Sequence, residues 1–298
     1  MYRHNPLCLY TKKQQTMKTL QKALLVLSLL AFFSISMMAQ SSKVIKEKRN
    51  LSGFSAISIS GGWDAVITQG ESFSVTIEAN KESMDNLRIE VKNETLYVSS
   101  ERTFRFLDIF RSRSSNIRKV YITLPLLQKI TASGGSNILP QTSFSTENMK
   151  ILLSGGSDLE SLSLDCQSLD CKMSGGSDAN IHLVNGENVK ITTSGGSDVS
   201  LSGISATLLN LQTSGGSDVK LEGTTTNFQV NASGGSDVAA FQLKATNCTA
   251  SLSGGSDADL HVTDALNVSL SGSSDVRCKG NPHTVEKTMN RGSSLKMM

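Results

Sequence analysis

The stretch SGGSDVSLSGISATLLNLQT, residues 194–213, is the unit from which most of this chain is built. Its opening motif, Ser-Gly-Gly-Ser followed by Asp or Asn, also begins at Ser133, Ser154, Ser174, Ser214, Ser233 and Ser253, with a Ser-Gly-Ser-Ser-Asp variant at Ser271. Successive motifs are 21, 20, 20, 20, 19, 20 and 18 residues apart. Weaker copies begin at Ser60 and Arg291. A fixed period of this length indicates a repeat architecture.

Apolar and polar residues alternate between the motifs. Val199 and Leu201 follow one motif, and Leu209 and Leu211 precede the next. A period of two predicts short strands with one apolar face. A unit this short cannot bury that face alone, so neighbouring units must stack to close a shared core. We therefore expect an all-β fold, a parallel β-helix (β-solenoid) with coils of about twenty residues, right-handed by the crossover rule.

The first 39 residues have the order of a secretory signal. Lys18 and Lys22 precede an apolar run over 23–39 that ends in a small residue. Cleavage is expected after Ala39 or Gln40, although the run is near the lower limit for an uncleaved membrane anchor. No later stretch is apolar enough to span a bilayer. We expect residues 40–298 to be a single exported β-solenoid domain in the periplasm, on the outer surface or outside the cell.

Within that domain, residues 132–298 hold the regular coils and residues 43–131 are expected to form less regular ones. An insertion rich in Arg and Phe is expected at 102–118. The strands expected in the irregular part are Phe54–Ser60, Ala65–Gln69, Ser72–Ala79, Leu87–Val91, Thr95–Ser99 and Val120–Leu124.

Composition and charge narrow the function. Removing the first 39 residues takes away five positive charges and leaves 24 basic against 26 acidic residues, which argues against a nucleic-acid partner. Aromatic residues are 5% of the chain, so an aromatic-walled catalytic cleft is disfavoured. Each motif serine recurs in every coil, whereas a catalytic serine is singular. We expect a non-enzymatic protein, with two alternatives open: a polysaccharide-active enzyme on a β-helix scaffold and a purely structural envelope protein.

Several segments together resemble a known family. They are FSAISISGG at 54–62, VYITLP at 120–125, ITASG at 130–134, the recurring Ser-Gly-Gly-Ser units, and GNP at 280–282. In these the chain resembles the auto-transporter adhesin head GIN domain proteins of Gram-negative bacterial envelopes. The resemblance covers nearly all of the exported part. It implies a right-handed β-solenoid in the envelope or outside the cell, with no established catalytic residues.

The acidic residue that closes each motif is the first candidate for ligand binding. The residue after it belongs to the inward set, so alternation points the carboxylates outward, one per coil. This row comprises Asn137, Asp158, Asp178, Asp198, Asp218, Asp237, Asp257 and Asp275. Like charges ~4.8 Å apart repel by about 0.9 kcal/mol per pair in water. Either backbone N–H groups of each Gly-Gly turn offset this, or bridging Ca²⁺ does. Ladders of motif serines are expected beside the row.

A second candidate binding region is the insertion. Its residues Arg102, Arg105, Arg111 and Arg113, together with Arg118, alternate with apolar side chains. These arginines are expected either to engage an anionic glycan or lipid surface or to belong to a loop that covers part of the solenoid.

Four cysteines remain after the expected cleavage. Cys171, Cys248 and Cys278 stand at inward offsets and are expected to be buried thiols. Only Cys166 and Cys171, five apart around a bend, are spaced for a disulfide. No metal site is expected from the cysteines, and no cofactor beyond the calcium alternative. The sequence thus predicts a solenoid that presents Ser and Asp ladders to a glycan or envelope protein, and it leaves the ligand and the oligomeric state open.

Overall fold

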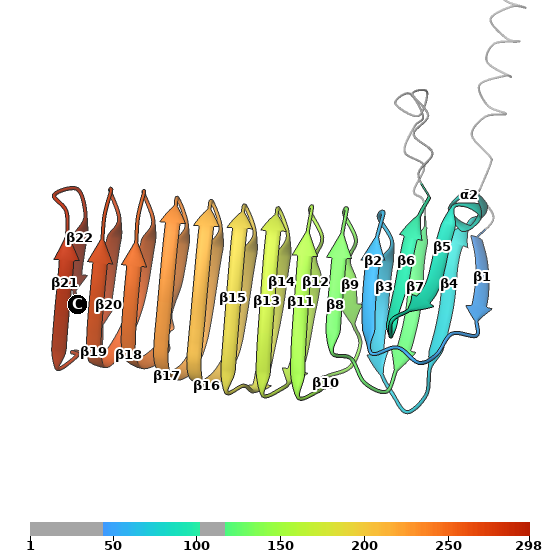
Figure 1. Ribbon diagram of the computed structural model, residues 1–298, viewed down its shortest axis with the longest axis horizontal. Coiled ribbons are helices and arrows are strands. Elements are labelled where there is room, and N and C mark those ends of the chain that lie inside the picture. Colours follow the sequence, from blue (N-terminus) through green and yellow to red (C-terminus); the bar gives the residue numbers. More distant parts are fainter. Residues whose placement is uncertain (1–43, 102–116) are drawn as a thin grey trace, which may run out of the picture. The chain divides into compact units, whose positions relative to one another are not determined.

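The computed structural model describes residues 44–101 and 117–298. Residues Val44–Met298 form one compact unit, a β-solenoid of about 8 turns in which nearly all the structure is strand (Figure 1). The predicted fold class is therefore confirmed. The predicted signal segment, residues 1–39, lies outside the described residues.

Each regular coil has two arms joined by the motif turn. The first arm runs into the motif and the second arm leaves it. First arms are β2 (Ala56–Ser60), β8 (Lys129–Ser133), β11 (Asn148–Ser154), β13 (Ser168–Gly175) and β15 (Asn188–Gly195). Second arms are β3 (Asp64–Gln69), β9 (Ile138–Pro140), β12 (Leu159–Asp165) and β14 (Asp178–Asn185). The short β10 (Phe144–Ser145) pairs with β12.

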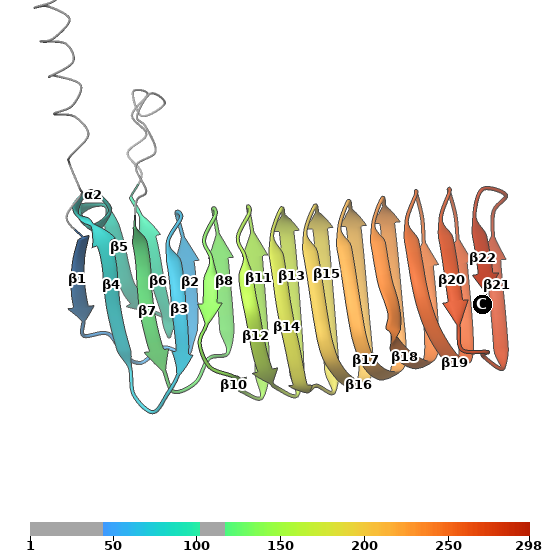
Figure 2. The same ribbon diagram turned by 180° about the vertical axis from the view of Figure 1, so that it is seen from behind.

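Further along the chain, each strand runs from one motif to the next and contributes a second arm and the following first arm. These long strands are β16 (Asp198–Gly215), β17 (Asp218–Gly234), β18 (Asp237–Leu252) and β19 (Asp257–Leu270). The last strands are β20 (Asp275–Lys279), β21 (Thr284–Met289) and β22 (Ser294–Met297). First arms pair in parallel with first arms, and second arms with second arms. The first arms face the viewer in Figure 1 and the second arms in Figure 2.

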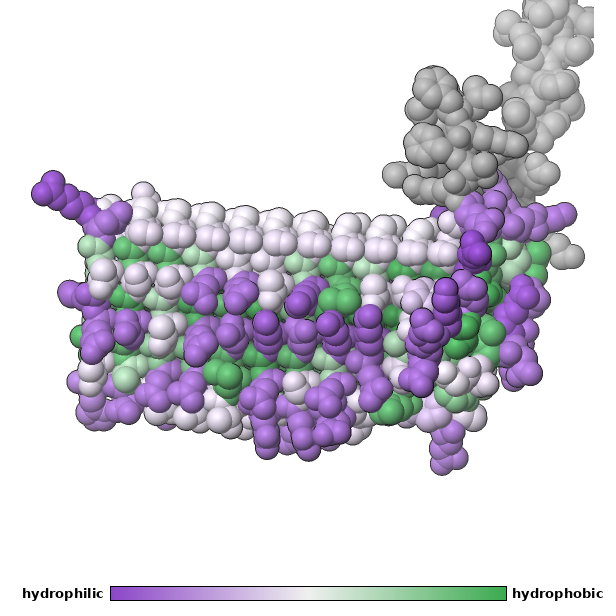
Figure 3. All heavy atoms as spheres, viewed as in Figure 1, coloured by the Kyte–Doolittle hydropathy of each residue, from purple (hydrophilic) through white to green (hydrophobic). Residues whose placement is uncertain are grey.

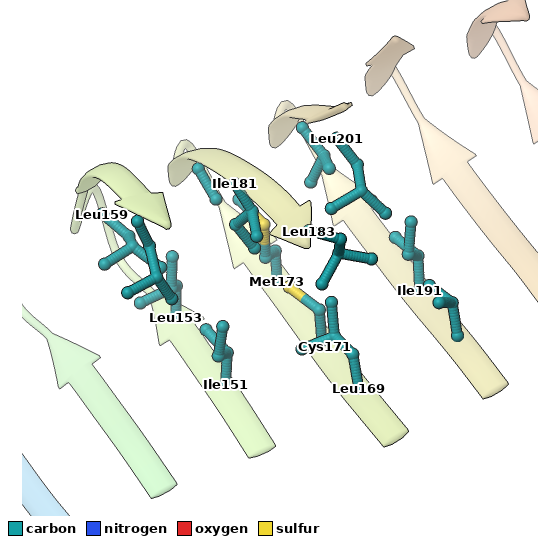
Figure 4. Packing of buried hydrophobic residues seen from close by; sticks show 14 of the residues in the cluster. Ile151, Leu153, Leu159, Leu169, Cys171, Met173, Ile181, Leu183, Ile191 and Leu201 are labelled. Atoms are coloured by element: carbon teal, nitrogen blue, oxygen red, sulfur yellow. The ribbon is translucent and has the colours of Figure 1, made fainter. Parts of the chain in front are cut away.

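The core lies between the two arms and is built by alternation, as predicted. Ile151 of β11 pairs with Cys171 of β13, which pairs with Ile191 of β15. All three are buried, and Figure 4 shows their side chains pointing into the same interior. Every coil thus supplies apolar groups to one continuous core, and each such side chain contributes about 1.5–3 kcal/mol when fully buried.

The N-terminal end departs from the expectation of coils throughout, because some of its strands pair antiparallel. β4 (Ser74–Asn80) lies antiparallel between β1 (Val44–Arg49) and β7 (Arg118–Leu124). β5 (Leu87–Lys92) and β6 (Thr95–Ser100) form a hairpin whose turn residues, Asn93 and Glu94, both have positive φ. The five-residue α2 (Lys81–Asp85) follows β4. The six strands predicted in this region are all present.

The weak motif copy at Ser60 explains how this end joins the regular coils. β2 and β3 pair in parallel with β8 and β9, so Ser60-Gly61-Gly62 forms the same turn as later motifs. Trp63 takes the place of the second motif serine, is fully buried, and donates its indole N–H to Ser100 Oγ at 2.9 Å. In the part of the chain that the structure describes, no helix has the length and apolar character needed to cross a bilayer.

Candidate binding surface: the acid row

The motif turn depends on its first glycine. In β16 this is Gly215, with φ +87°, and a Cβ there would lie 2.5 Å from the carbonyl oxygen of Gly195 in the preceding coil. The left-handed backbone and the close coil-to-coil approach therefore both require glycine. The second glycine is less constrained from Gly176 onward, since a Cβ on Gly216 would meet nothing nearer than 4.0 Å, whereas Gly62, Gly135 and Gly156 have positive φ. Accordingly Ser273 replaces this glycine in the last regular motif.

The second serine of each motif is fully buried, so the prediction that both motif serines form surface ladders is wrong for this one. Ser217 donates its hydroxyl to Ser214 O at 3.2 Å and accepts the backbone N–H of Ser197 at 3.3 Å. The same bond, from the hydroxyl of the second serine to the carbonyl of the first, forms in each motif from the one that contains Ser177 to the one that contains Ser274. Because these bonds satisfy polar groups inside the turn, the hydroxyl belongs to the scaffold. The first serine of each motif remains partly or fully exposed.

The acidic residues line up as predicted. Asp178 pairs with Asp198, and Asp237 pairs with Asp218 on one side and Asp257 on the other. Asp257 in turn pairs with Asp275. Side chains from Asp178 onward are exposed, whereas Asn137 and Asp158 are half-buried. We call this outward line, from Asp158 to Asp275, the acid row.

The predicted source of hydrogen bonds to the acid row is wrong. The carboxylates accept from the adjacent coil: Asp218 donates its N–H to Asp198 Oδ1 at 3.2 Å, and Ser294 donates its hydroxyl to Asp275 Oδ1 at 2.7 Å. Glycine amides of the turn instead donate to carbonyls of the preceding coil, as Gly216 does to Gly195 at 2.7 Å. Stacking the coils therefore uses the N–H groups that were expected to serve the carboxylates.

Two carboxyls of the acid row, Asp178 and Asp237, have raised pKa values. The pKa of Asp178 is raised, first by desolvation and then by the neighbouring carboxylates of Asp158 and Asp198. The pKa of Asp237 is raised by desolvation and by Asp218, Asp257 and Asp259. Neighbouring carboxylates thus add to the rise in the pKa of Asp178 and Asp237, and a bound positive group would lower both pKa values.

Calcium binding requires several oxygen ligands around one ion. Across residues 44–101 and 117–298, no three His, Cys, Asp or Glu side chains converge closely enough to hold a metal. The row supplies one carboxylate per coil, which gives a line of charges and not a ligand cage.

A shallow groove of about 670 Å³ runs along the acid row. Its lining includes Asp178, Asp198 and Asp218 together with other outward residues of the second arms, such as Ser200 and Lys220. The groove spans coils from Asp158 to Ala239 and is open along its length. Its shape suits an extended partner.

One polar cluster on the same face was missed by the sequence reasoning. Arg277 Nε and Nη2 donate to the two oxygens of Asp259 at 2.6 and 2.7 Å. The Arg277 guanidinium also lies 5.7 Å from the ring centre of Phe241. Asp259 and Arg277 stand two residues after the motif Asp in successive coils, so the repeat offset was a signal that could have found the pair.

Two histidines contact polar side chains of adjacent coils. His182 Nδ1 lies 3.0 Å from Ser202 Oγ in the adjacent coil, and His182 is exposed. Among the described side chains, no carboxylate hydrogen-bonds to His182. His283 contacts Asp264 at 3.0 Å.

Of the candidate arginines, Arg102, Arg105, Arg111 and Arg113 lie outside the described residues. Arg118 belongs to β7 and not to the insertion. Its Nε donates to Ser83 Oγ and its Nη1 to Gly61 O, both at 3.1 Å. It thereby ties α2 and β7 to the first motif turn.

The cysteines are structural. Cys166, Cys171, Cys248 and Cys278 are buried and free, so the disulfide alternative for Cys166 and Cys171 is wrong. Burial raises the pKa of Cys166 to about 11 and that of Cys171 to about 12. Such thiols stay protonated and unreactive near neutral pH.

Comparison with known proteins now assigns the family. The family model described as "Putative auto-transporter adhesin, head GIN domain" matches residues 53–182 and again 180–282. The chain belongs to this family. No curated protein matches the sequence.

Solved structures share the fold at low sequence identity. A putative adhesin from Parabacteroides merdae superposes with a TM-score of 0.62 at 18% identity, covering 87% of this chain and 97% of that one. A putative lipid binding protein from Parabacteroides distasonis gives 0.62 at 17% identity, covering 87% and 98%. A putative adhesin from the same organism gives 0.61 at 17% identity, covering 87% and 98%. At these identities the likeness is evidence for the fold alone.

Proposed function

We propose that this GIN-domain protein is an exported, non-enzymatic adhesin-like protein of the cell envelope, which holds a repetitive glycan or protein partner along the acid row. The observation that carries the proposal is the register of exposed carboxylates, one per coil, beside a groove across several coils. Each carboxylate makes a weak contact alone. A partner with regularly spaced positive or hydrogen-bond-donating groups would engage many at once, so that weak contacts combine into useful avidity.

The family description and the adhesin neighbours support an interaction role. A lipid ligand, as named for one neighbour, finds less support here. The large apolar side chains exposed on the described residues are few and spread along the chain, such as Tyr97, Val184 and Val285. A lipid site would need them gathered into a patch.

The test compares the wild-type protein with a variant carrying Asp178→Asn, Asp198→Asn and Asp218→Asn. These substitutions keep shape and remove charge. Binding to isolated envelope polymers, to a deacetylated amino-sugar polymer and to a polylysine peptide should fall in the variant and weaken with salt. Glu71→Gln, an exposed residue outside the row, is the matched control.

Two results would count against the proposal. Equal binding by the variant and the wild-type protein would remove the acid row from the interaction. Release of new reducing ends from a polysaccharide panel by the wild-type protein would favour the enzyme alternative.

A further inference from the structure

The face opposite the acid row carries a different kind of surface. It consists of the outward side chains of the first arms in four successive coils, within residues 208–212, 227–231, 247–251 and 265–269, and we call it the amide face. None of its side chains is charged. Most are amides, namely Asn210, Gln212, Asn227, Gln229, Asn231, Asn247 and Asn267. Figure 3 shows the hydrophilic side chains of this side in rows along the solenoid axis, below a paler line of Ser and Gly at the motif turns.

Hydrogen bonds between coils hold these amides in place. Asn247 Nδ2 donates to Asn227 Oδ1 at 3.2 Å, and Asn227 Nδ2 donates to the carbonyl of Thr207 at 3.4 Å. In the neighbouring row Asn210 Nδ2 donates to Gln229 Oε1 at 3.2 Å. A side-chain amide has two donor hydrogens and two acceptor lone pairs. Asn227, Gln229 and Asn247 are oriented by these bonds and retain further donor or acceptor capacity, whereas Oδ1 of Asn210 is buried without a partner.

A groove of about 400 Å³ lies on the same face. Its lining includes the amides Asn227, Gln229 and Asn247 and the half-buried Leu208. Leu208 supplies the apolar side chain of this lining, because the side chain of Phe228 is 2% exposed and belongs to the core. Polar groups beside an apolar side chain are the usual composition of a ligand site.

The absence of charge on this face restricts the partner. A charged polymer would lose hydration without gaining an opposite charge, and an apolar partner would strip water from amides without replacing their hydrogen bonds. A neutral polymer with many hydroxyl groups avoids both losses, because it carries no charge to desolvate and each hydroxyl can donate to and accept from the amides. Sugar rings also have apolar C–H faces, for which Leu208 offers an apolar contact.

Spacing favours an extended glycan over a compact one. Equivalent amides in adjacent coils are about 4.8 Å apart, close to the advance of one sugar ring in an extended β-linked chain. We propose that the amide face binds an uncharged β-linked polysaccharide lying along the solenoid axis. This goes beyond the proposed function, since it assigns a second face and a ligand of different chemistry.

The experiment measures binding of wild-type protein to cello-oligosaccharides, laminarin and β-mannan by affinity electrophoresis and calorimetry. The test variant carries Gln212→Ala, Asn231→Ala and Ser251→Ala, one exposed row in register that takes no part in the amide ladder. Its affinity should fall about tenfold, since several hydrogen bonds of modest strength are lost together. A second variant, Gln229→Lys, places charge and bulk on the face and should weaken binding similarly.

A control variant tests whether the effect is specific to the amide face. Thr224→Ala with Lys244→Ala makes comparable changes at two exposed positions in register that line neither groove, and should leave neutral-glycan binding unchanged. Binding should also be insensitive to salt between low and high concentration, because no ion pairs form.

The proposal is overturned if none of the three neutral glycans binds, or if both amide-face variants bind as well as the wild-type protein. It is also overturned if light scattering shows that the amide face mediates a dimer that these variants dissociate in the absence of glycan, since the occupant would then be a second copy. Failure of the acid-row test alone would leave this result intact.

Discussion

At the scale of single residues, each position of the motif has a different structural role. In Ser214-Gly215-Gly216-Ser217-Asp218 the first glycine adopts the left-handed backbone, the buried serine links two coils, and the aspartate faces solvent. Adjacent positions thus meet opposite requirements, which explains why the motif recurs as a block.

The two glycines should respond differently to substitution. Gly215→Ala forces a side chain into positive φ, costing about 1–3 kcal/mol, and pushes its Cβ toward the Gly195 carbonyl. We expect a clear fall in Tm. Gly216→Ser, which copies Ser273 of the last motif, should change Tm little. Thermal melts of both variants check this, and equal losses would show that the turn geometry described here is wrong.

The buried serine should matter for stability although it has no ligand. Ser217→Ala removes one donor to Ser214 O and leaves the Ser197 N–H without its acceptor. An unsatisfied buried group costs about 1–3 kcal/mol, so Tm should fall, whereas Ser205→Ala at an exposed position should be neutral. Urea or thermal unfolding measures the difference. An unchanged Tm for Ser217→Ala would mean that the buried motif hydroxyls do not stabilise the fold.

The inward or outward direction of most motif residues could be predicted from the sequence, and the errors have identifiable causes. The period of two correctly placed Asp218 outward from its neighbour Val219. The same rule puts Ser217 two residues before Val219 and hence inward, which the expectation of serine ladders beside the acid row did not take into account. Bond partners of the carboxylates were missed because a single coil does not show which N–H groups stacking will use.

At the scale of elements, carboxylates of neighbouring coils interact along the acid row. The pKa of Asp237 is raised by desolvation and by its neighbours in the row. A carboxyl whose folded pKa lies above its unfolded value favours folding when protonated. Its contribution is fully present below the unfolded pKa and is lost as pH rises through the folded pKa.

Asp237→Asn should therefore raise Tm at pH 7 in low salt, and this gain should disappear near pH 3, where the wild-type carboxyl is protonated. Added salt should shrink the gain, because exposed charges are screened. Glu71→Gln outside the row is the control. A lower Tm for Asp237→Asn than for the wild-type protein at pH 7 would show that the charged Asp237 carboxylate stabilises the fold.

Pairing direction at the N-terminal end was the element-level feature that sequence did not provide. Alternation marks a strand and its buried face, but it is the same for parallel and antiparallel neighbours. The hairpin turn at Asn93 and Glu94 lacks a glycine, so the usual signal for a two-residue turn was weak.

At the scale of the whole solenoid, equivalent coils should be interchangeable. Deleting residues 194–213 joins Thr193 to Ser214 and keeps every inward and outward position in phase. The shortened protein should remain folded and cooperative, since each coil contacts mainly its neighbours. Deleting only Val199–Leu208, half a coil, should abolish folding. Circular dichroism and gel filtration distinguish these outcomes, and unfolding of the full-coil deletion would contradict a modular solenoid.

The central claim, that about twenty residues advance the chain by one coil, is tested most directly by electron-spin distances along the acid row. Cysteines at Asp158 paired with Asp237, Asp257 or Asp275 are spin-labelled at neutral pH, with Cys8 replaced by serine; the four buried thiols have raised pKa values and should not react. We predict distances of about 19, 24 and 29 Å, growing by one strand spacing per coil. Distances that fail to increase in equal steps would contradict the account.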